Sequence, residues 1–250
     1  MVLKDKHFLV MGTGKSGTAA ACLLKKQQIT AALYDGNAGL DKEAFYQNNP
    51  LLKGIPLYCG ELPEEVAKAT DILILSPGVP ADLAFVQGLR DKGIVVWGEV
   101  ELAYVCSKGK LLAITGTNGK TTTTALLGEI LKSHYLDVKI VGNIGIPYTS
   151  IASETTSETV TVAEISSFQL ETAHTFAPQV TAILNITPDH LDRHHTMANY
   201  VAAKEGIVKN QGPNDLCVLN YEDEELRRFG EGLCVRVCWF SSKRRLKDGF

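Results

Sequence analysis

Short apolar runs alternate with helix-like stretches along most of this chain. In the first half, strands are predicted at His7–Met11, Thr30–Asp35, Asp71–Leu75 and Ile94–Val96, and helices at Gly17–Gln27 and Ala81–Asp91. In the second half, strands are predicted at Leu111–Thr115, Lys139–Val141, Val160–Glu164, Val180–Leu184 and Cys217–Leu219, and a helix at Lys120–His134. Short runs rich in β-branched residues are typical of parallel strands buried on both faces. The alternation therefore predicts an α/β fold with doubly wound sheets.

The pattern is interrupted once, at Ser107–Lys110, and then starts again. A chain of 250 residues is long enough for two ordinary domains, so we expect two α/β domains in series. Ser150–Ser157, rich in Ser, Thr and Glu, is expected to be a surface loop. Nothing after the predicted strand Val235–Phe240 completes the second domain, which favours a fragment of a longer protein.

Composition excludes several other classes of protein. The net charge of −3 shows no basic excess, which argues against a nucleic-acid partner. No run of about 18 apolar residues is present, so no membrane span is expected. The six cysteines form no C-x-x-C pair, which favours structural thiols in a reducing cytoplasm.

The segment Gly116-Thr-Asn-Gly119-Lys120-Thr121-Thr122 lies between a predicted strand and a predicted helix. It differs from the usual G-x-x-x-x-G-K-[ST] pattern, because its leading glycine comes two residues later. The working parts are nevertheless present. Backbone amides can surround phosphates, Lys120 supplies a positive charge, and the Thr121 hydroxyl can hold Mg²⁺. The segment therefore predicts an ATP-binding loop.

A second glycine loop, Gly12-Thr-Gly-Lys-Ser-Gly17, also follows a strand and opens a helix. Its glycines permit a tight turn, close approach of a phosphate, and packing of helix on strand. Asp35 ends the next strand, where a carboxylate can meet a ribose hydroxyl. The pattern fits NAD, a UDP-sugar, or a glycine turn without a ligand.

Polar residues follow two further strands. Glu164 ends an apolar strand, so it is expected at the carboxyl edge of the sheet, where a carboxylate can hold Mg²⁺. The aperiodic run Asn185–His194 suits a functional loop in which His190 is a metal ligand or an acid/base. His194 and His195 are interpreted as surface residues. Lys204 lies on a predicted helix, Asn199–Val208, where a lysine is ordinarily a solvated charge.

Taken together, these residues resemble the Mur ligases of peptidoglycan synthesis over essentially the whole chain. The resemblance is carried by eight segments: Gly12–Gly17, Ser76–Pro80, Gly98–Leu102, Gly116–Thr122, Gly142–Gly145, Glu164–Leu170, Asn185–Arg193 and Tyr200–Lys204. Glu164–Leu170 favours the member that adds D-glutamate to UDP-N-acetylmuramoyl-L-alanine. The resemblance implies a Rossmann-like UDP-binding domain over residues 1–108 and a P-loop-type central ATPase domain over residues 109–250. It also implies a C-terminal amino-acid-binding domain that these residues lack, and hence little activity from them alone.

The resemblance also implies a reaction and its residues. The substrate carboxylate attacks the γ-phosphate of ATP, and D-glutamate then displaces phosphate from the acyl phosphate. ATP would bind Gly116, Thr117, Asn118, Gly119, Lys120, Thr121 and Thr122. The UDP substrate would bind Gly14, Lys15, Ser16, Asp35, Ser76, Pro77, Gly78 and Asn143. Two Mg²⁺ ions would be held by Thr121, Glu164, His190 and Lys204, the last as a carbamate, and the catalytic residues would be Lys120, His190 and Lys204.

Two other functions remain open at this point. One is an NAD-dependent oxidoreductase that uses Gly12–Gly17 and Asp35, which leaves the Gly116–Thr122 loop unexplained. The other is a non-catalytic nucleotide-binding module. We expect a cytoplasmic monomer with small-molecule partners, no nucleic acid and no membrane.

Overall fold

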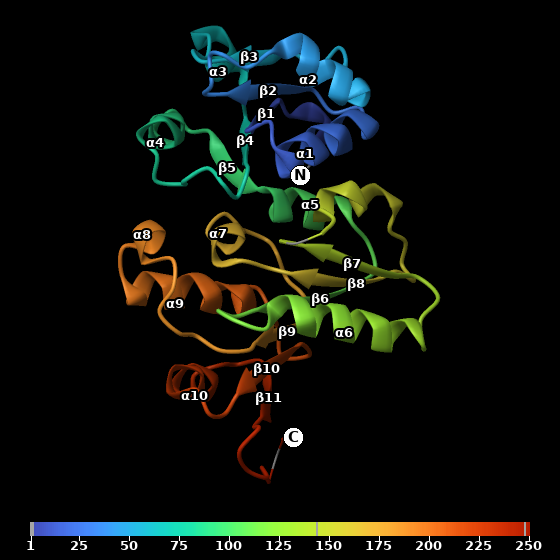
Figure 1. Ribbon diagram of the computed structural model, residues 1–250, viewed down its shortest axis with the longest axis vertical. Coiled ribbons are helices and arrows are strands. Elements are labelled where there is room, and N and C mark those ends of the chain that lie inside the picture. Colours follow the sequence, from blue (N-terminus) through green and yellow to red (C-terminus); the bar gives the residue numbers. More distant parts are fainter. Residues whose placement is uncertain (1–2, 144, 248) are drawn as a thin grey trace. The chain divides into compact units, whose positions relative to one another are not determined.

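The computed structural model describes residues 3–143, 145–247 and 249–250, and Ile144 of the Gly142–Gly145 segment lies outside them. The chain forms two compact units (Figure 1). The first contains the chain up to Ser107 together with Pro147–Glu154 and Thr172–His174. The second contains Lys108–Ile146, Thr155–Glu171 and Thr175–Phe250. Among the described residues, no helix is long and apolar enough to cross a membrane.

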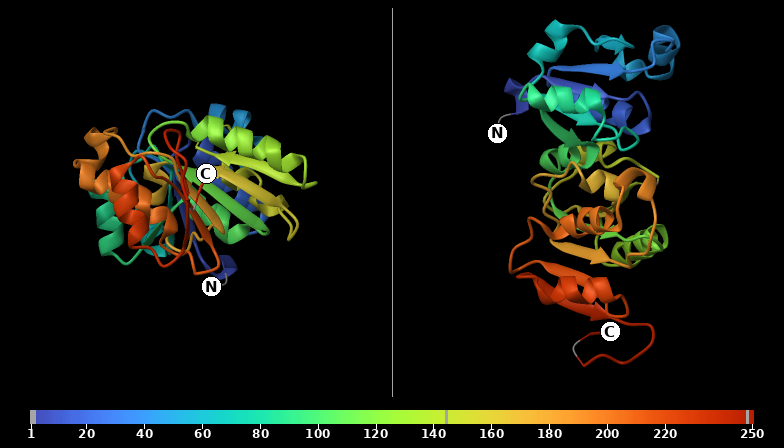
Figure 2. Two further views of the ribbon diagram at one scale, coloured as in Figure 1. Left: turned by 90° about the horizontal axis from the view of Figure 1, so that it is seen from below. Right: turned by 90° about the vertical axis from the view of Figure 1, so that its left-hand side faces the viewer.

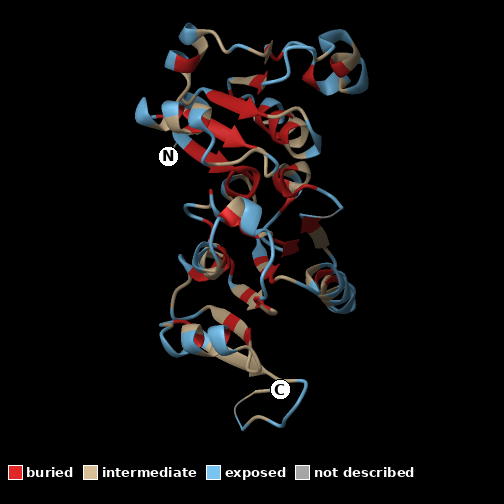
Figure 3. Cartoon of the chain, turned by 60° about the vertical axis from the view of Figure 1, so that its left-hand side comes forward, coloured by how far each residue is buried: buried red, intermediate tan, exposed pale blue. Residues whose placement is uncertain are grey.

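The first unit is built on a five-stranded parallel sheet in the order β3-β2-β1-β4-β5. Its strands are β1 (Phe8–Met11), β2 (Ala31–Asp35), β3 (Leu57–Cys59), β4 (Ile72–Leu75) and β5 (Val95–Gly98). Its helices are α1 (Lys15–Lys26), α2 (Lys42–Asn48), α3 (Glu64–Ala69), α4 (Ala84–Asp91) and α5 (Glu99–Cys106). Every residue of β1 and β4 is buried, as the red strands of Figure 3 show, because helices cover both faces. The strand order reverses between β1 and β4, and ligands of open α/β sheets bind at such a point.

The second unit is built on a six-stranded parallel sheet in the order β11-β10-β9-β6-β8-β7. Its strands are β6 (Lys110–Thr115), β7 (Val138–Gly142), β8 (Val160–Glu164), β9 (Val180–Ile183), β10 (Leu216–Asn220) and β11 (Arg236–Phe240). Its helices are α6 (Lys120–Lys132), α7 (Ser167–Leu170), α8 (Leu191–His194), α9 (Met197–Glu205) and α10 (Glu224–Glu231). Helix α6 packs over β7 and β8 (Figure 2). The carboxyl ends of β6, β8 and β9 therefore lie side by side at one edge of this sheet.

Two short segments from the second half of the chain complete the first unit. Both the amide and the hydroxyl of Thr149 donate to Glu99 Oε1 at 2.7 Å. The amide of His174 donates to Glu101 Oε2 at 2.9 Å. Both acidic side chains are buried on α5, with Glu99 2% and Glu101 0% exposed. The acids of the Gly98–Leu102 segment are therefore internal anchors for residues 147–154 and 172–174.

The sequence-based fold class is confirmed, and the differences are local. The expected surface loop is wrong for its first half, because it contains a 3-10 helix (Ala152–Glu154) whose Ala152 is 1% exposed. The helix predicted at Asn199–Val208 is α9 followed by a second 3-10 helix at Gly206–Val208. Further 3-10 helices lie at Leu3–Asp5, Pro50–Leu52 and Tyr148–Ser150.

Candidate nucleotide and substrate sites

The Gly116–Thr122 segment is a tight turn between β6 and α6. Gly116 and Gly119 have φ of 148° and 83°, which is why glycine occupies both positions. The loop is braced by the chain that follows β9: the amide of Thr117 donates to Asn185 O at 2.9 Å, and that of Asn118 to Asn185 Oδ1 at 2.8 Å. The N-terminus of a helix with free amides is an anion site. The loop has the form required to hold phosphates.

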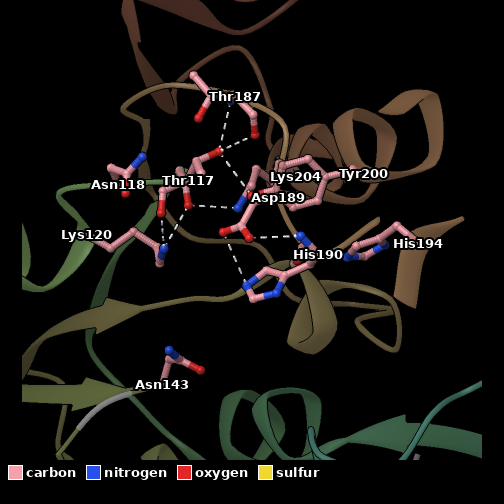
Figure 4. Close-up of polar contacts among 12 residues, drawn as sticks. Thr117, Asn118, Lys120, Asn143, Thr187, Asp189, His190, His194, Tyr200 and Lys204 are labelled. Carbon is pink, nitrogen blue, oxygen red and sulfur yellow. Dashed lines mark hydrogen bonds and ion pairs between the residues drawn. The ribbon is translucent and has the colours of Figure 1, made fainter. Parts of the chain in front are cut away.

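Lys120, the first residue of α6, turns its ammonium back over the loop. Its Nζ donates to the carbonyl oxygens of Gly116 at 2.9 Å and Thr117 at 2.8 Å (Figure 4). Thr121 and Thr122 follow in the first turn and are exposed. A cation and a hydroxyl therefore flank the same helix N-terminus.

Lys204 on α9 is buried beside this loop, with 2% of the residue exposed. Its Nζ donates to Gly116 O at 2.7 Å and lies 4.7 Å from the centre of the Tyr200 ring. Burial, reinforced by the charge of Lys120 and opposed by Asp189, lowers the pKa of Lys204 to about 7. The interpretation of Lys204 as a solvated helical charge is wrong. A substantial fraction of this amine is neutral and nucleophilic near pH 7.

Glu164 ends β8 at the predicted edge and is 2% exposed. Asn143 Nδ2 donates to Glu164 Oε1 at 3.2 Å, and the Asn143 amide donates to Glu164 O at 2.9 Å. A β-carbon at Gly142 would lie 2.0 Å from the same carbonyl, so β7 and β8 approach closely here. Asn143, predicted to bind the UDP substrate, thus belongs to the second unit and contacts a predicted metal ligand.

His190 lies at the start of α8 in a left-handed conformation, with φ of 52°. Its Nε2 is 3.5 Å from Asp189 Oδ2 (Figure 4). Its ring lies 5.0 Å from that of Phe168. Among the described residues, no three His, Cys, Asp or Glu side chains gather into a metal site. The four metal ligands stay a prediction.

The two histidines that follow differ in their surroundings. His195 is exposed, as predicted. The interpretation of His194 as a surface residue is wrong, because it is 4% exposed and its Nε2 lies 2.9 Å from Ser167 Oγ. An isolated histidine in an aperiodic loop gives no sequence signal of burial.

No role was assigned from the sequence to Thr187, Asp189 or Tyr200, which lie beside the loop. Thr117 Oγ1 lies 3.0 Å from the Tyr200 hydroxyl and donates to Thr187 O at 3.1 Å. Asp189 faces both His190 and Lys204. All three lie in segments already singled out as polar and aperiodic or as part of the resemblance. Their positions were therefore marked, but the contacts between them could not be read from the sequence.

The glycine loop of the first unit lies at the carboxyl edge of its sheet. Gly12 has φ of 103°, and Gly14 is the N-cap of α1, which places Lys15 and Ser16 in the first turn. A β-carbon at Gly17 would lie 1.9 Å from Gly12 O, so this glycine packs helix on strand as predicted.

Asp35 and Ser76 flank this loop from the neighbouring strands. Asp35 Oδ2 accepts hydrogen bonds from the amide of Thr13 at 3.1 Å and from its hydroxyl at 2.6 Å. Burial raises the pKa of Asp35, but hydrogen bonds from Thr13 and Asn37 outweigh it, so the net pKa is lowered. Ser76, followed by Pro77 and Gly78, has a buried hydroxyl without a hydrogen-bond partner among the described residues. Unpartnered buried hydroxyls are rare, and one beside a phosphate-type loop suits a ligand contact.

A cavity of about 320 Å³ lies beside α1 in the first unit. Lys15 lines it, together with Cys22, Lys26, Leu51 and Thr149. Of the eight predicted substrate residues, Lys15 alone lines this cavity. The cavity therefore does not coincide with the glycine loop and its flanking residues.

Comparisons with known proteins agree along the whole chain. A family model described as the Mur ligase middle domain matches residues 114–248, and one described as the Mur ligase MurD-like N-terminal domain matches residues 6–98. The chain is 51% identical over 244 residues to the UDP-N-acetylmuramoylalanine--D-glutamate ligase of Lachnoclostridium phytofermentans, covering 98% of this chain and 54% of the relative. It is 50% identical over 249 residues to the ligase of the same name from Lachnospira eligens, covering 100% and 55%. The chain thus spans about half the length of the curated relatives it matches.

A solved structure shares the fold. The UDP-N-acetylmuramate:L-alanyl-gamma-D-glutamyl-meso-diaminopimelate ligase from Neisseria meningitides matches with a TM-score of 0.63 and 18% identity, covering 98% of this chain and 82% of that one. At this identity the match concerns the fold alone.

Proposed function

The chain belongs to the Mur ligase family, and we propose that its protein is an ATP-dependent amide ligase that adds D-glutamate to UDP-N-acetylmuramoyl-L-alanine in peptidoglycan precursor synthesis. The observation that carries the proposal is the Gly116–Thr122 loop, with Lys120 and the buried Lys204 both bonded to Gly116 O. The 51% identity to a D-glutamate-adding ligase supports the choice of amino acid.

The reaction has two steps. A carboxylate oxygen of UDP-N-acetylmuramoyl-L-alanine attacks the γ-phosphorus of ATP, and the bond from that phosphorus to the β-bridging oxygen breaks, releasing ADP. The amine of D-glutamate then attacks the acyl carbon of the acyl phosphate. Phosphate leaves, the nitrogen loses a proton, and an amide remains.

Charge is the main obstacle to the first step, because a carboxylate must approach a triphosphate. Lys120 would exchange its bonds to Gly116 O and Thr117 O for the phosphates and neutralise charge that develops during transfer. The loop amides of residues 116–122 would hold the phosphates at the helix N-terminus. Binding and orientation of two anions are thus what this loop contributes.

The residues at the edge of the second sheet fit magnesium. Mg²⁺ prefers oxygen ligands, and the Glu164 carboxylate and the exposed Thr121 hydroxyl are of that kind. His190 and a carbamate on Lys204 would complete the set for two ions. When bound, the ions would supply Lewis-acid neutralisation of phosphate charge.

The environment of Lys204 supports its carbamylation. A carbamate forms only from the neutral amine, and the pKa of about 7 makes that form abundant at neutral pH. Reaction with CO2 joins the amine nitrogen to carbon and releases one proton. A buried cation next to Lys120 would thereby become an anion, which removes the repulsion between the two lysines.

The first unit would bind the UDP end of the substrate. Gly14, Lys15 and Ser16 would present the N-terminus of α1 to the diphosphate, and the unpaired hydroxyl of Ser76 supports a contact from β4. The rest of this binding site would be formed by Asp35, Pro77 and Gly78. Asn143 would contact the muramoyl end of the substrate. The domain roles follow: residues 1–108 bind the UDP substrate, and residues 109–250 bind ATP.

We also propose a cytoplasmic monomer. All six cysteines are free thiols, which suits a reducing compartment. The two proposed substrates, a nucleotide-activated sugar and ATP, are compounds of such a compartment.

Two measurements on the full-length protein separate this function from an NAD-dependent oxidoreductase: calorimetry for ligand binding, and an assay of phosphate release for turnover. We expect binding of UDP-N-acetylmuramoyl-L-alanine, and release of phosphate from ATP only when that substrate and D-glutamate are both present. Lys120→Ala should lower this turnover at least about 100-fold, whereas Lys209→Ala, an exposed lysine of the same unit, should not. Binding of NADH, with no binding of the UDP substrate, would replace the proposal with an oxidoreductase.

A further inference from the structure

The buried His194 connects two short helices at the edge of the second sheet. Its Nε2 lies 2.9 Å from Ser167 Oγ, and its Nδ1 lies 3.3 Å from Glu171 Oε1. Ser167 begins α7 and Glu171 follows its last residue. One ring on α8 therefore contacts both ends of α7.

Arg193 strengthens the same connection. Its Nη2 donates to Glu171 Oε2 at 2.9 Å, so consecutive residues of α8 engage both oxygens of one carboxylate. The Arg193 guanidinium lies 4.7 Å from the centre of the Phe168 ring. The His194 ring stacks on Phe168 at 5.3 Å and lies 5.2 Å from Tyr200 of α9 (Figure 4). Helix α8 is thus fixed from its C-terminal end by charge, hydrogen bonds and ring contacts.

The protonation of His194 fits these contacts. Burial lowers its pKa, the Glu171 carboxylate opposes this, and Arg193, His190 and Lys204 lower it further. A neutral ring at pH 7 can donate from Nδ1 to Glu171 and accept from the Ser167 hydroxyl at Nε2. This tautomer gives each ring nitrogen of His194 a polar partner.

Both ends of α8 have residues in a strained backbone conformation. His190 has φ of 52° and His195 has φ of 66°, so a four-residue helix lies between two non-glycine residues in unfavourable conformations. Such conformations persist only where the surrounding structure imposes them. The contacts of Arg193 and His194 with Glu171 restrain this helix from its C-terminal end.

We infer that His194 is a positioning residue, which anchors α8 to α7 and so holds His190 in its left-handed conformation beside Asp189 and Phe168. The catalytic consequence rests on the proposed function, in which His190 would help to hold a metal ion. The anchoring of α8 to α7 does not depend on that function.

Two substitutions at position 194 separate anchoring from packing. His194→Phe keeps an aromatic ring against Phe168 and Tyr200 but removes both polar contacts. His194→Asn fills less space but keeps a donor near the position of Nδ1, within reach of Glu171. If the polar anchor matters, Asn retains more activity than Phe, whereas a packing role gives the reverse order. His134→Phe, at an exposed histidine of the same unit, is the matched control.

The first measurement is steady-state turnover of the full-length protein. We expect His194→Phe to lower kcat about 10- to 100-fold with KM for ATP changed less than about threefold, because the reacting groups are misplaced while ATP still binds. His134→Phe should leave both constants unchanged. In a protein with ligase activity, equal effects of His194→Phe and His134→Phe on kcat overturn the inference.

The second measurement is amide hydrogen exchange without substrates, which does not depend on the reaction. The amides of Arg193 and His194 donate to His190 O, and that of His195 donates to Leu191 O. We expect these amides to exchange at least about tenfold faster in His194→Phe, while Gly116–Thr122 is unaffected. Unchanged exchange in α8 overturns the inference. Faster exchange in a protein without ligase activity supports the anchor and removes the proposed function.

Discussion

Lys204 gives the second unit a specific dependence of stability on pH. Its folded-state pKa of about 7 lies below the ordinary lysine value near 10.4. Between these values the unfolded chain binds more protons than the folded protein, so the free energy of unfolding rises with pH. The rise can approach about 1.4 kcal/mol per pH unit.

We predict that Lys204→Met removes this rise between pH 7 and 9. The measurement is urea unfolding in buffers purged of CO2, so that the amine stays unmodified. Lys209→Met, at an exposed position, should keep the slope of the parent protein. A slope in Lys204→Met equal to that of the parent would show that the Lys204 amine is not held near neutrality.

Gly17 lies too close to the backbone of the first glycine loop to carry a side chain. A β-carbon there would lie 1.9 Å from Gly12 O, a backbone atom that cannot move without disturbing β1. We predict that Gly17→Ala destabilises the first unit by about 1–3 kcal/mol. Gly14→Ala is the control, because nothing lies within 4 Å of its added carbon; its cost, about 1 kcal/mol or less, should come only from a weaker N-cap. Similar unfolding midpoints for the two variants would contradict this account.

At the scale of elements, the stability contributed by α5 depends on pH, because its acidic side chains are buried. Burial raises the pKa of Glu99, and the two hydrogen bonds from Thr149 only partly oppose this. Because the folded-state pKa exceeds the unfolded value near 4.3, the folded protein binds the proton more tightly. The contribution of Glu99 to the free energy of unfolding is therefore fully present at low pH. It is lost as the pH rises through the pKa of Glu99 in the folded protein.

We predict that Glu99→Gln becomes more stable relative to the parent protein as the pH rises from 4 to 7. The amide oxygen can accept the same two bonds from Thr149 without a charge to bury. Thermal unfolding across this range is the measurement, and Glu61→Gln, at an exposed position, should follow the parent. A parallel course of the Glu99→Gln and parent curves would count against a raised pKa.

Elements with a clear period or a flanking glycine could be predicted from the sequence, and the others could not. The strands β6 and β8 and the helix α6 follow directly from apolar runs and the Gly116–Thr122 turn. Helices α7 and α8 have four residues each, too few to show a helical period. Helix α5 mixes acids with apolar residues on all sides, because its acids are buried, so it shows no polar face.

The residues of the candidate ATP site likewise include some that could be predicted from the sequence and some that could not. Glu164 could be predicted because it ends a strand, and the ends of parallel strands share an edge. The burial of Lys204 and His194 could not, because it depends on α7, α8 and α9 packing together. Only Lys204 was singled out, and that rested on the resemblance rather than on the pattern.

At the scale of the whole molecule, the first unit is built from segments that are not consecutive in the sequence. The first unit includes Pro147–Glu154 and Thr172–His174, although the chain enters the second unit at Lys108. Removal of these segments would take from Glu99 and Glu101 the donors of Thr149 and His174. It would also remove the packing of Tyr148–Ser150 on α5. The first unit would then lose both hydrogen bonds and buried apolar surface.

We therefore predict that residues 1–107 expressed alone are less stable than the same residues within the 250-residue chain, by about 3 kcal/mol or more. Amide exchange of β1 and β4 measures this in both. Glu99→Gln and Glu101→Gln together should not recover the loss in the shorter chain, because solvated acids carry no burial penalty there. Equal protection in the two chains would show that the inserted segments are dispensable.

This sharing of the chain has a consequence during translation. The first unit lacks its last partner until His174 has been made, 67 residues after Ser107. At synthesis rates of about 5–20 residues per second, the nascent first unit waits roughly 3–13 s with the acids of α5 still solvated. Its folding cannot finish in strict order from the N-terminus. The ribosome must deliver much of the second unit before the first can close.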